Sequence, residues 1–107
     1  MSHKTTIEAV CDYIRLQGGK CWKTSQVGRL YGSAGIPDVI AAICIPDRLI
    51  KMNPVRWQML FVEVKVGEDK LSPAQQGFRD IAELCGVPVI VGGLDDVLPY
   101  VENLKHP

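Results

Sequence analysis

The feature that most constrains the fold is an uninterrupted apolar run, VIAAICI, over residues 39–45. A run that is apolar at every position is typical of a strand covered on both faces, so we expect it inside a sheet. A second strand is predicted over residues 57–66, where side chains on one face stand about 6.6 Å apart at a rise of about 3.3 Å per residue. Glu63 and Lys65 are predicted to be such neighbours.

The remaining segments complete an α/β order. Apolar periodicity and start or stop signals predict helices over 6–17, 73–85 and 95–104, the last opened by Asp95 as N-cap, and short strands over 20–24 and 87–91. The predicted fold class is therefore α/β, with a helix, three strands, a helix, a strand and a C-terminal helix around a mixed sheet. We expect residues 1–107 to form a single domain, because a chain of this length has room for one modest core.

Composition excludes some classes of protein. The chain is 47% hydrophobic and 22% charged, and no apolar run approaches the roughly 20 residues of a membrane span. The first six residues lack the apolar stretch of a secretory signal, which favours the cytoplasm. The net charge of zero gives no support for nucleic-acid binding, although residues 1–35 carry five basic and two acidic side chains. This pattern is compatible with a basic N-terminal third that meets phosphates, and equally with a solvated surface whose charges are unevenly spread.

The four cysteines, at positions 11, 21, 44 and 85, have no C-x-x-C spacing. Each lies in or beside an apolar segment, as small buried hydrophobic residues do, so we expect all four in or near the core. A zinc site that combines cysteines with His3 and His106 is a less favoured alternative, because the two histidines lie at opposite ends of the chain, where ends fray.

Asp38 and Glu63 are the acidic residues that the strand pattern brings together. Two carboxylates about 4 Å apart repel by roughly 4 kcal/mol at an effective dielectric constant near 20, so such a pair needs a cation or a proton. Mg²⁺ or Mn²⁺ would suit Asp38, Glu63 and the backbone carbonyl of Val64, because these hard ions prefer oxygen ligands. Lys65 would then orient a water molecule and add positive charge beside a phosphate.

Several segments resemble one known family. They are Glu8 in the first predicted helix, GIPDVI at 35–40, FVEVK at 61–65, and LSPAQ at 71–75 before a helix that ends at Gly86. Together they resemble the VRR-NUC family of the PD-(D/E)XK nuclease superfamily, over about residues 5–98. The resemblance implies a restriction-endonuclease-like core of a helix, three strands, a helix and a strand, and a VRR-NUC-like nuclease domain of the stand-alone type found in bacteria and phages.

The resemblance also implies roles for individual residues. Asp38, Glu63 and Glu8 would bind the metal ion, Lys65 would be the catalytic lysine, and Gln75 would position the lysine or the phosphate. Stand-alone members resemble resolvases of four-way (Holliday) DNA junctions that act as homodimers, so we expect branched DNA as the partner. The 24 residues between Asp38 and Glu63 exceed the family's usual short hairpin, which leaves the substrate-contacting surface open.

Simpler interpretations compete with these roles. Glu8 and Gln75 each occupy the fourth position of a capping-box pattern, at 5–8 and 72–75. Glu63 with Lys65 could be an exposed charged pair, and Asp38 could be a turn residue. A second Pro-Asp pair makes Asp47, which is nearer to Glu63 in the sequence, an alternative metal ligand. We reject it because Asp47 follows the apolar run, whereas Asp38 leads into it.

Contacts with DNA are expected from Lys20, Lys23 and Arg29. Trp22 could stack on DNA, although a tryptophan on a short strand is more often a core residue. The sequence thus predicts a metal-dependent, structure-selective deoxyribonuclease, for which a four-way junction resolvase is the preferred interpretation. The alternatives are a nickase or flap nuclease in repair or phage replication, and a non-catalytic nucleic-acid-binding module that retains the fold.

Overall fold

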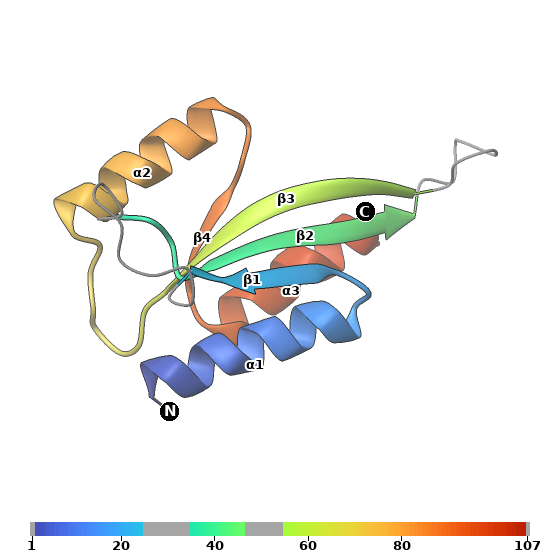
Figure 1. Cartoon of the computed structure of the whole chain (residues 1–107), viewed down its shortest axis with the longest axis horizontal. Coiled ribbons are helices and arrows are strands. Elements are labelled where there is room, and N and C mark those ends of the chain that lie inside the picture. Colours follow the sequence, from blue (N-terminus) through green and yellow to red (C-terminus); the bar gives the residue numbers. More distant parts are fainter. Residues whose placement is uncertain (1, 25–34, 47–54, 107) are drawn as a thin grey trace.

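The computed structural model describes residues 2–24, 35–46 and 55–106 (Figure 1). Its elements are, in chain order, α1 (His3–Leu16), β1 (Lys20–Lys23), β2 (Val39–Pro46), β3 (Val55–Val64), α2 (Pro73–Leu84), β4 (Val89–Gly92) and α3 (Leu94–Lys105). The predicted α/β class and the predicted order of elements are therefore confirmed. Within the described ranges, none of the helices has the length and apolar character that crossing a bilayer needs.

The four strands form one mixed sheet in the order β1-β2-β3-β4. Neighbouring strands are antiparallel from β1 to β3, and β3 pairs with β4 in parallel. In the β2–β3 ladder Val39 lies opposite Val62 and Pro46 lies opposite Val55. Extending this register by one residue places Asp38 opposite Glu63, so the two acidic residues share one end of the sheet.

Helix α1 begins earlier than the sequence indicated. Ser2 is its N-cap, and the Ser2 hydroxyl accepts a hydrogen bond from the Thr5 backbone N–H at 3.1 Å. The capping box expected at residues 5–8 is therefore wrong, because Thr5 already lies in the first turn. The predicted apolar stripe of this helix is confirmed, and its buried members include Ile7, Val10, Cys11 and Ile14.

One face of the sheet is covered by α1 and α3, which both contact β2 (Figure 1). The side chains that fill this interface alternate along the strands, and they include Val39, Ala41, Ile43, Leu60, Val62 and Val64, each with no exposed surface. Val97 and Val101 of α3 are equally buried against them. This layer is the hydrophobic core of the described chain.

The opposite face of the sheet is largely open. Ile40, Ala42 and Cys44 of β2 are only partly buried, and Trp57 and Met59 of β3 are 52% and 46% exposed. The expectation that β2 is covered on both faces is therefore wrong. Helix α2 contacts this side chiefly near one end of the sheet, where the rings of Phe61 and Phe78 pack edge to face with centroids 5.2 Å apart.

Two smaller expectations also fail. Cys11 and Cys21 are buried and Cys44 is partly buried, but Cys85 is exposed at the C-cap of α2, because the apolar stripe of that helix meets little of the sheet. The N-cap of α3 is Gly93 instead of Asp95. The Asp96 carboxylate accepts a hydrogen bond from the Gly93 N–H at 3.0 Å and so provides the stabilisation of the helix start that was expected from Asp95.

Candidate active site

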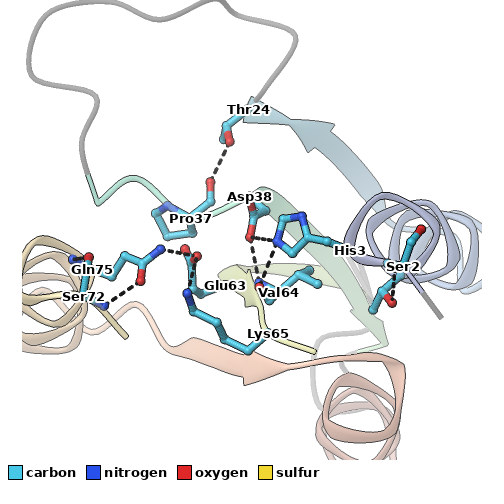
Figure 2. Close-up of polar contacts among 11 residues, drawn as sticks. Ser2, His3, Thr24, Pro37, Asp38, Glu63, Val64, Lys65, Ser72 and Gln75 are labelled. Atoms are coloured by element: carbon cyan, nitrogen blue, oxygen red, sulfur yellow. Dashed lines mark hydrogen bonds and ion pairs between the residues drawn. The ribbon is translucent and has the colours of Figure 1, made fainter. Parts of the chain in front are cut away.

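Asp38 stands directly before β2 and is fixed by the neighbouring strand. Its Oδ2 atom accepts a hydrogen bond of 2.9 Å from the Val64 backbone N–H, and its side chain is 23% exposed. The Thr24 backbone N–H donates to the Asp38 carbonyl, and the Thr24 hydroxyl donates to the Pro37 carbonyl. The Asp38 carboxylate is therefore held at the end of the sheet beside His3 and Val64 (Figure 2), and it stays partly exposed.

The segment before Asp38 packs against the start of α2. Gly35 has a φ angle of +87°, which side chains other than glycine rarely adopt. A Cβ atom at Gly35 would overlap the Ala74 backbone, so only glycine allows this approach. The close packing brings the first turn of α2 to the same end of the sheet as Asp38.

Glu63 is almost completely buried, at 4% exposure, although it is acidic. Its Oε1 accepts a 2.7 Å hydrogen bond from the Gln75 side-chain amide, whereas Oε2 accepts none from the residues that the structure describes. Burial and the neighbouring Asp38 raise the Glu63 pKa to about 7, and Lys65 partly offsets the rise. Near neutral pH the Glu63 carboxyl is therefore protonated in part, and a further cation beside it would favour its ionised form.

Lys65 lies next to Glu63, as the strand alternation predicted. Its Nζ is 4.0 Å from Glu63 Oε1, and its side chain is only 18% exposed. The Lys65 backbone N–H donates to the Gly92 carbonyl at 2.9 Å, which anchors the residue just after β3 ends. The interpretation of Glu63 and Lys65 as an exposed surface pair is wrong, because both side chains are mostly buried.

Gln75 is a helix-capping residue that also contacts the buried carboxylate. It completes a capping box, in which the Ser72 hydroxyl accepts from the Gln75 N–H at 3.2 Å and Gln75 Oε1 accepts from the Ser72 N–H at 2.8 Å. The same side chain donates through Nε2 to Glu63. The capping box fixes the rotamer of Gln75 and thereby presents its amide to the buried carboxylate.

His3 is the residue at this site that sequence reasoning missed. Its Nε2 atom lies 3.0 Å from the Val64 carbonyl oxygen and 3.4 Å from Asp38 Oδ2 (Figure 2). The expectation that His3 lies on a frayed end is therefore wrong. The signal that could have found it is Ser2, because a serine N-cap at position 2 places His3 in the first turn of a helix.

The structure does not bring Glu8 to this group. Glu8 is exposed on α1, and it takes part in none of the hydrogen bonds or ion pairs found among residues 2–24, 35–46 and 55–106. Five residues separate it from His3, which at 3.6 residues per turn places the two side chains on different sides of the helix. His3 rather than Glu8 is the α1 side chain that contacts Asp38.

The residues expected to contact DNA do not share one surface. Lys20 and Lys23 are three positions apart on β1 and so point to opposite faces of the sheet, with Lys23 nearer to Asp38. Trp22 is 52% exposed instead of being a core residue, and with Lys20 it borders an open hollow of about 410 Å³. Arg29 and Asp47 lie outside the described residues.

The donor atoms at this end of the sheet fit a hard divalent cation. Asp38 and Glu63 supply carboxylates that interact with each other, Glu63 Oε2 is buried without a hydrogen-bond donor among the described residues, and the Val64 carbonyl lies beside them. Mg²⁺ in enzymes is commonly held by only one or two carboxylates together with water and substrate phosphates. As the described side chains are placed, no three His, Cys, Asp or Glu residues are grouped as a metal site, so a backbone carbonyl, water or phosphate would have to supply ligands beside the carboxylates. The same finding disfavours the cysteine-based zinc alternative.

Two helices begin beside these carboxylates. The first turn of α1 supplies His3 next to Asp38, and the first turn of α2 supplies Gln75 next to Glu63 (Figure 2). Helix N-termini carry partial positive charge and free backbone N–H groups, which favour anions. The two helix starts therefore add partial positive charge beside the carboxylates, although burial and Asp38 still leave the Glu63 pKa raised.

Comparisons of the chain with protein-family profiles, with curated proteins and with solved structures gave no match in any of the three. The resemblance to a nuclease family thus stays a hypothesis that depends on the residues quoted from the sequence, and the functional interpretation depends on the site geometry.

Proposed function

We propose that this chain is a divalent-metal-dependent DNA endonuclease of the VRR-NUC type with a restriction-endonuclease-like core. The observation that carries the proposal is the convergence of the Asp38 and Glu63 carboxylates at one end of the sheet. Gln75 donates a hydrogen bond to Glu63, and the Lys65 ammonium lies next to the same carboxylate. Four of the five positions to which the resemblance assigns a role are thus neighbours in space, which supports a shared role, whereas Glu8 lies apart from them.

Different residues would bind the metal ion and position its ligands, as phosphodiester hydrolysis requires. Asp38 and Glu63, with the Val64 carbonyl, would hold Mg²⁺ or Mn²⁺, and the chemistry that the ion supplies when bound is activation of water and neutralisation of developing phosphate charge. Glu63 would be ionised as a ligand, because carboxylates bind metal ions in the deprotonated form. Gln75 then keeps the Glu63 carboxylate in one orientation.

Lys65 acts on the substrate side of the same group. Its ammonium is held within 4.0 Å of Glu63 Oε1, so it stays near the carboxylates instead of extending into solvent. There it orients the attacking water through a hydrogen bond and adds positive charge next to the pentavalent phosphate, whose negative charge grows in the transition state. The helix N-termini beside it favour the same anion.

A four-way DNA junction cut by a homodimer is the substrate form that we propose, because the stand-alone members that the sequence resembles act on such junctions. Paired incisions of a junction need two active sites, and one described chain contains a single pair of facing carboxylates. Flap, nicked and linear substrates are the competing forms that an experiment must compare.

The test incubates the purified protein with labelled four-way junction, flap and linear duplex DNA, each with Mg²⁺, Mn²⁺ or a chelator. Asp38→Asn keeps an oxygen that can accept a hydrogen bond from the Val64 N–H. We expect Asp38→Asn and Lys65→Met each to lower the cleavage rate by about a thousandfold. Asp12→Asn is the matched control, because Asp12 is exposed on α1. Cleavage in chelator, or full activity of both site variants, would overturn the proposal, and metal-independent DNA binding without cleavage would indicate a non-catalytic module.

A further inference from the structure

The position of His3 is set by the fold and not by chance contact. The Ser2 cap starts α1 at His3, and α1 is fixed against the sheet by buried residues further along, so the imidazole reaches the end of β3 from the covered side of the sheet. His3 and Val64 are 61 positions apart in the sequence. The ring is 50% exposed and therefore accessible to an ion from solvent.

The distances around His3 Nε2 match those between neighbouring ligands of one metal ion. Two ligand atoms that each lie about 2.1 Å from an ion are about 3.0 Å apart at a right angle and about 3.4 Å apart at a tetrahedral angle. His3 Nε2 is 3.0 Å from the Val64 carbonyl oxygen and 3.4 Å from Asp38 Oδ2. Both separations from Nε2 therefore fit neighbouring positions of one coordination shell.

A hydrogen bond from Nε2–H to the Val64 carbonyl is the simpler explanation of the shorter distance. Together with the hydrogen bond from the Val64 N–H to Asp38 Oδ2, it holds the ring nitrogen, the carbonyl and the carboxylate side by side in the metal-free chain. Neither hydrogen bond engages Oε2 of the preceding residue, Glu63, which has no donor among the described residues. In the metal-bound form the imidazole proton would reside on Nδ1, which frees the Nε2 lone pair for the ion.

We propose that His3 Nε2 is a direct ligand of the divalent ion, next to Asp38 and the Val64 carbonyl, and fills the role that the family resemblance assigned to Glu8. The inference rests on the proposed metal-dependent function and specifies its ion. An imidazole nitrogen favours transition-metal ions, whereas a site made only of oxygen ligands suits Mg²⁺. The site therefore prefers Mn²⁺ to Mg²⁺.

The experiment measures Mn²⁺ binding to metal-free protein from the electron paramagnetic resonance signal of unbound Mn²⁺. The variants are His3→Gln, whose amide can still donate to the Val64 carbonyl, His3→Ala, and Asp38→Asn. Glu8→Gln and Lys4→Ala are matched controls on the same two turns of α1, and both residues are exposed. We expect both His3 variants to lower Mn²⁺ affinity by about tenfold or more, with a smaller loss for Mg²⁺ in a competition titration, and both controls to bind as the wild type does.

A second measurement observes the ligand directly. The chain has only two histidines, so ¹⁵N imidazole spectra contain His3 and His106 alone. Diamagnetic Zn²⁺ should shift the Nε2 resonance of His3 and leave His106 unchanged, since His106 lies at the opposite end of α3 from the site.

The outcomes separate this inference from the proposed function. Wild-type Mn²⁺ affinity in His3→Gln together with lost affinity in Asp38→Asn would overturn the role of His3 and leave the metal site intact. Equal affinity in all variants, or no binding by the wild type, would overturn the metal site itself. A loss in Glu8→Gln that matches the loss in His3→Gln would return the α1 ligand to Glu8.

Discussion

The two faces of the sheet differ in how completely they are covered, and the difference separates stability from chemistry. On the face under α1 and α3, the side chains of β2 and β3 are fully buried and apolar. On the other face, partly exposed Ile40 and Ala42 alternate with them along β2, and α2 packs chiefly near one end. The carboxylates of Asp38 and Glu63 lie at that end. Glu63 is on the open face with Phe61, and the next side chain along β3, Val64, is on the covered face. The covered face therefore holds the fold together, while the end of the open face, next to α2, carries the carboxylates of the proposed metal site.

Truncating an isoleucine to alanine on each face of the sheet should give the largest difference in the free energy of unfolding. Ile43→Ala removes a side chain with no exposed surface, so we expect it to lower the free energy of unfolding by about 3 kcal/mol. Ile40→Ala removes the same atoms on the open face of the same strand and should cost less than about 1.5 kcal/mol. Urea denaturation of both variants measures this, and equal losses would show that the open face is covered in solution.

The pH dependence of stability should reveal the one acidic residue that the open face buries. Because the Glu63 pKa is raised from 4.5 to about 7 in the folded chain, folding favours the protonated carboxyl. The stabilising contribution is complete below about pH 4.5, is lost as the pH rises through 7, and amounts to at most about 3 kcal/mol in metal-free protein. Glu63→Gln should remove this part of the pH dependence.

The control for that experiment is Glu83→Gln, on the exposed side of α2, where the glutamate pairs with Arg79. Urea denaturation at pH 5 and pH 8 in the presence of a chelator compares the three proteins. If the wild type and Glu63→Gln lose the same stability between the two pH values, Glu63 is ionised in the folded protein at both of them.

The capping box of α2 gives the smallest expected effect and distinguishes its two members. Ser72→Ala and Gln75→Ala should each lower stability by about 1 kcal/mol, because each removes one of the reciprocal hydrogen bonds. Only Gln75→Ala also removes the contact with Glu63, so only this variant should lower the cleavage rate beyond its effect on stability. Equal cleavage rates at a temperature where both variants are folded would reduce Gln75 to a capping residue.

Much of the architecture follows from local patterns. The periodicity of α1, the alternation that pairs Glu63 with Lys65, and the Ser72–Pro73 start of α2 depend on residues a few positions apart, so they could be predicted. The boundaries were less certain, because Ser2 and Thr5 both offer a hydroxyl to cap α1 and only the packed helix selects Ser2. Local signals also allowed Gln75 either a cap or a role at the site, and the structure shows the cap together with a hydrogen bond to Glu63.

The sequence alone determined the order of elements and which side chains on a strand are neighbours, because these depend on periodicities of 3.6 and 2 residues. The tertiary structure decided the rest. Only strand pairing sets Asp38 opposite Glu63, and only the packing of α1 places His3 beside Asp38 and turns Glu8 outward. The raised Glu63 pKa likewise arises from burial and from a charge distant in sequence, and no local pattern encodes either.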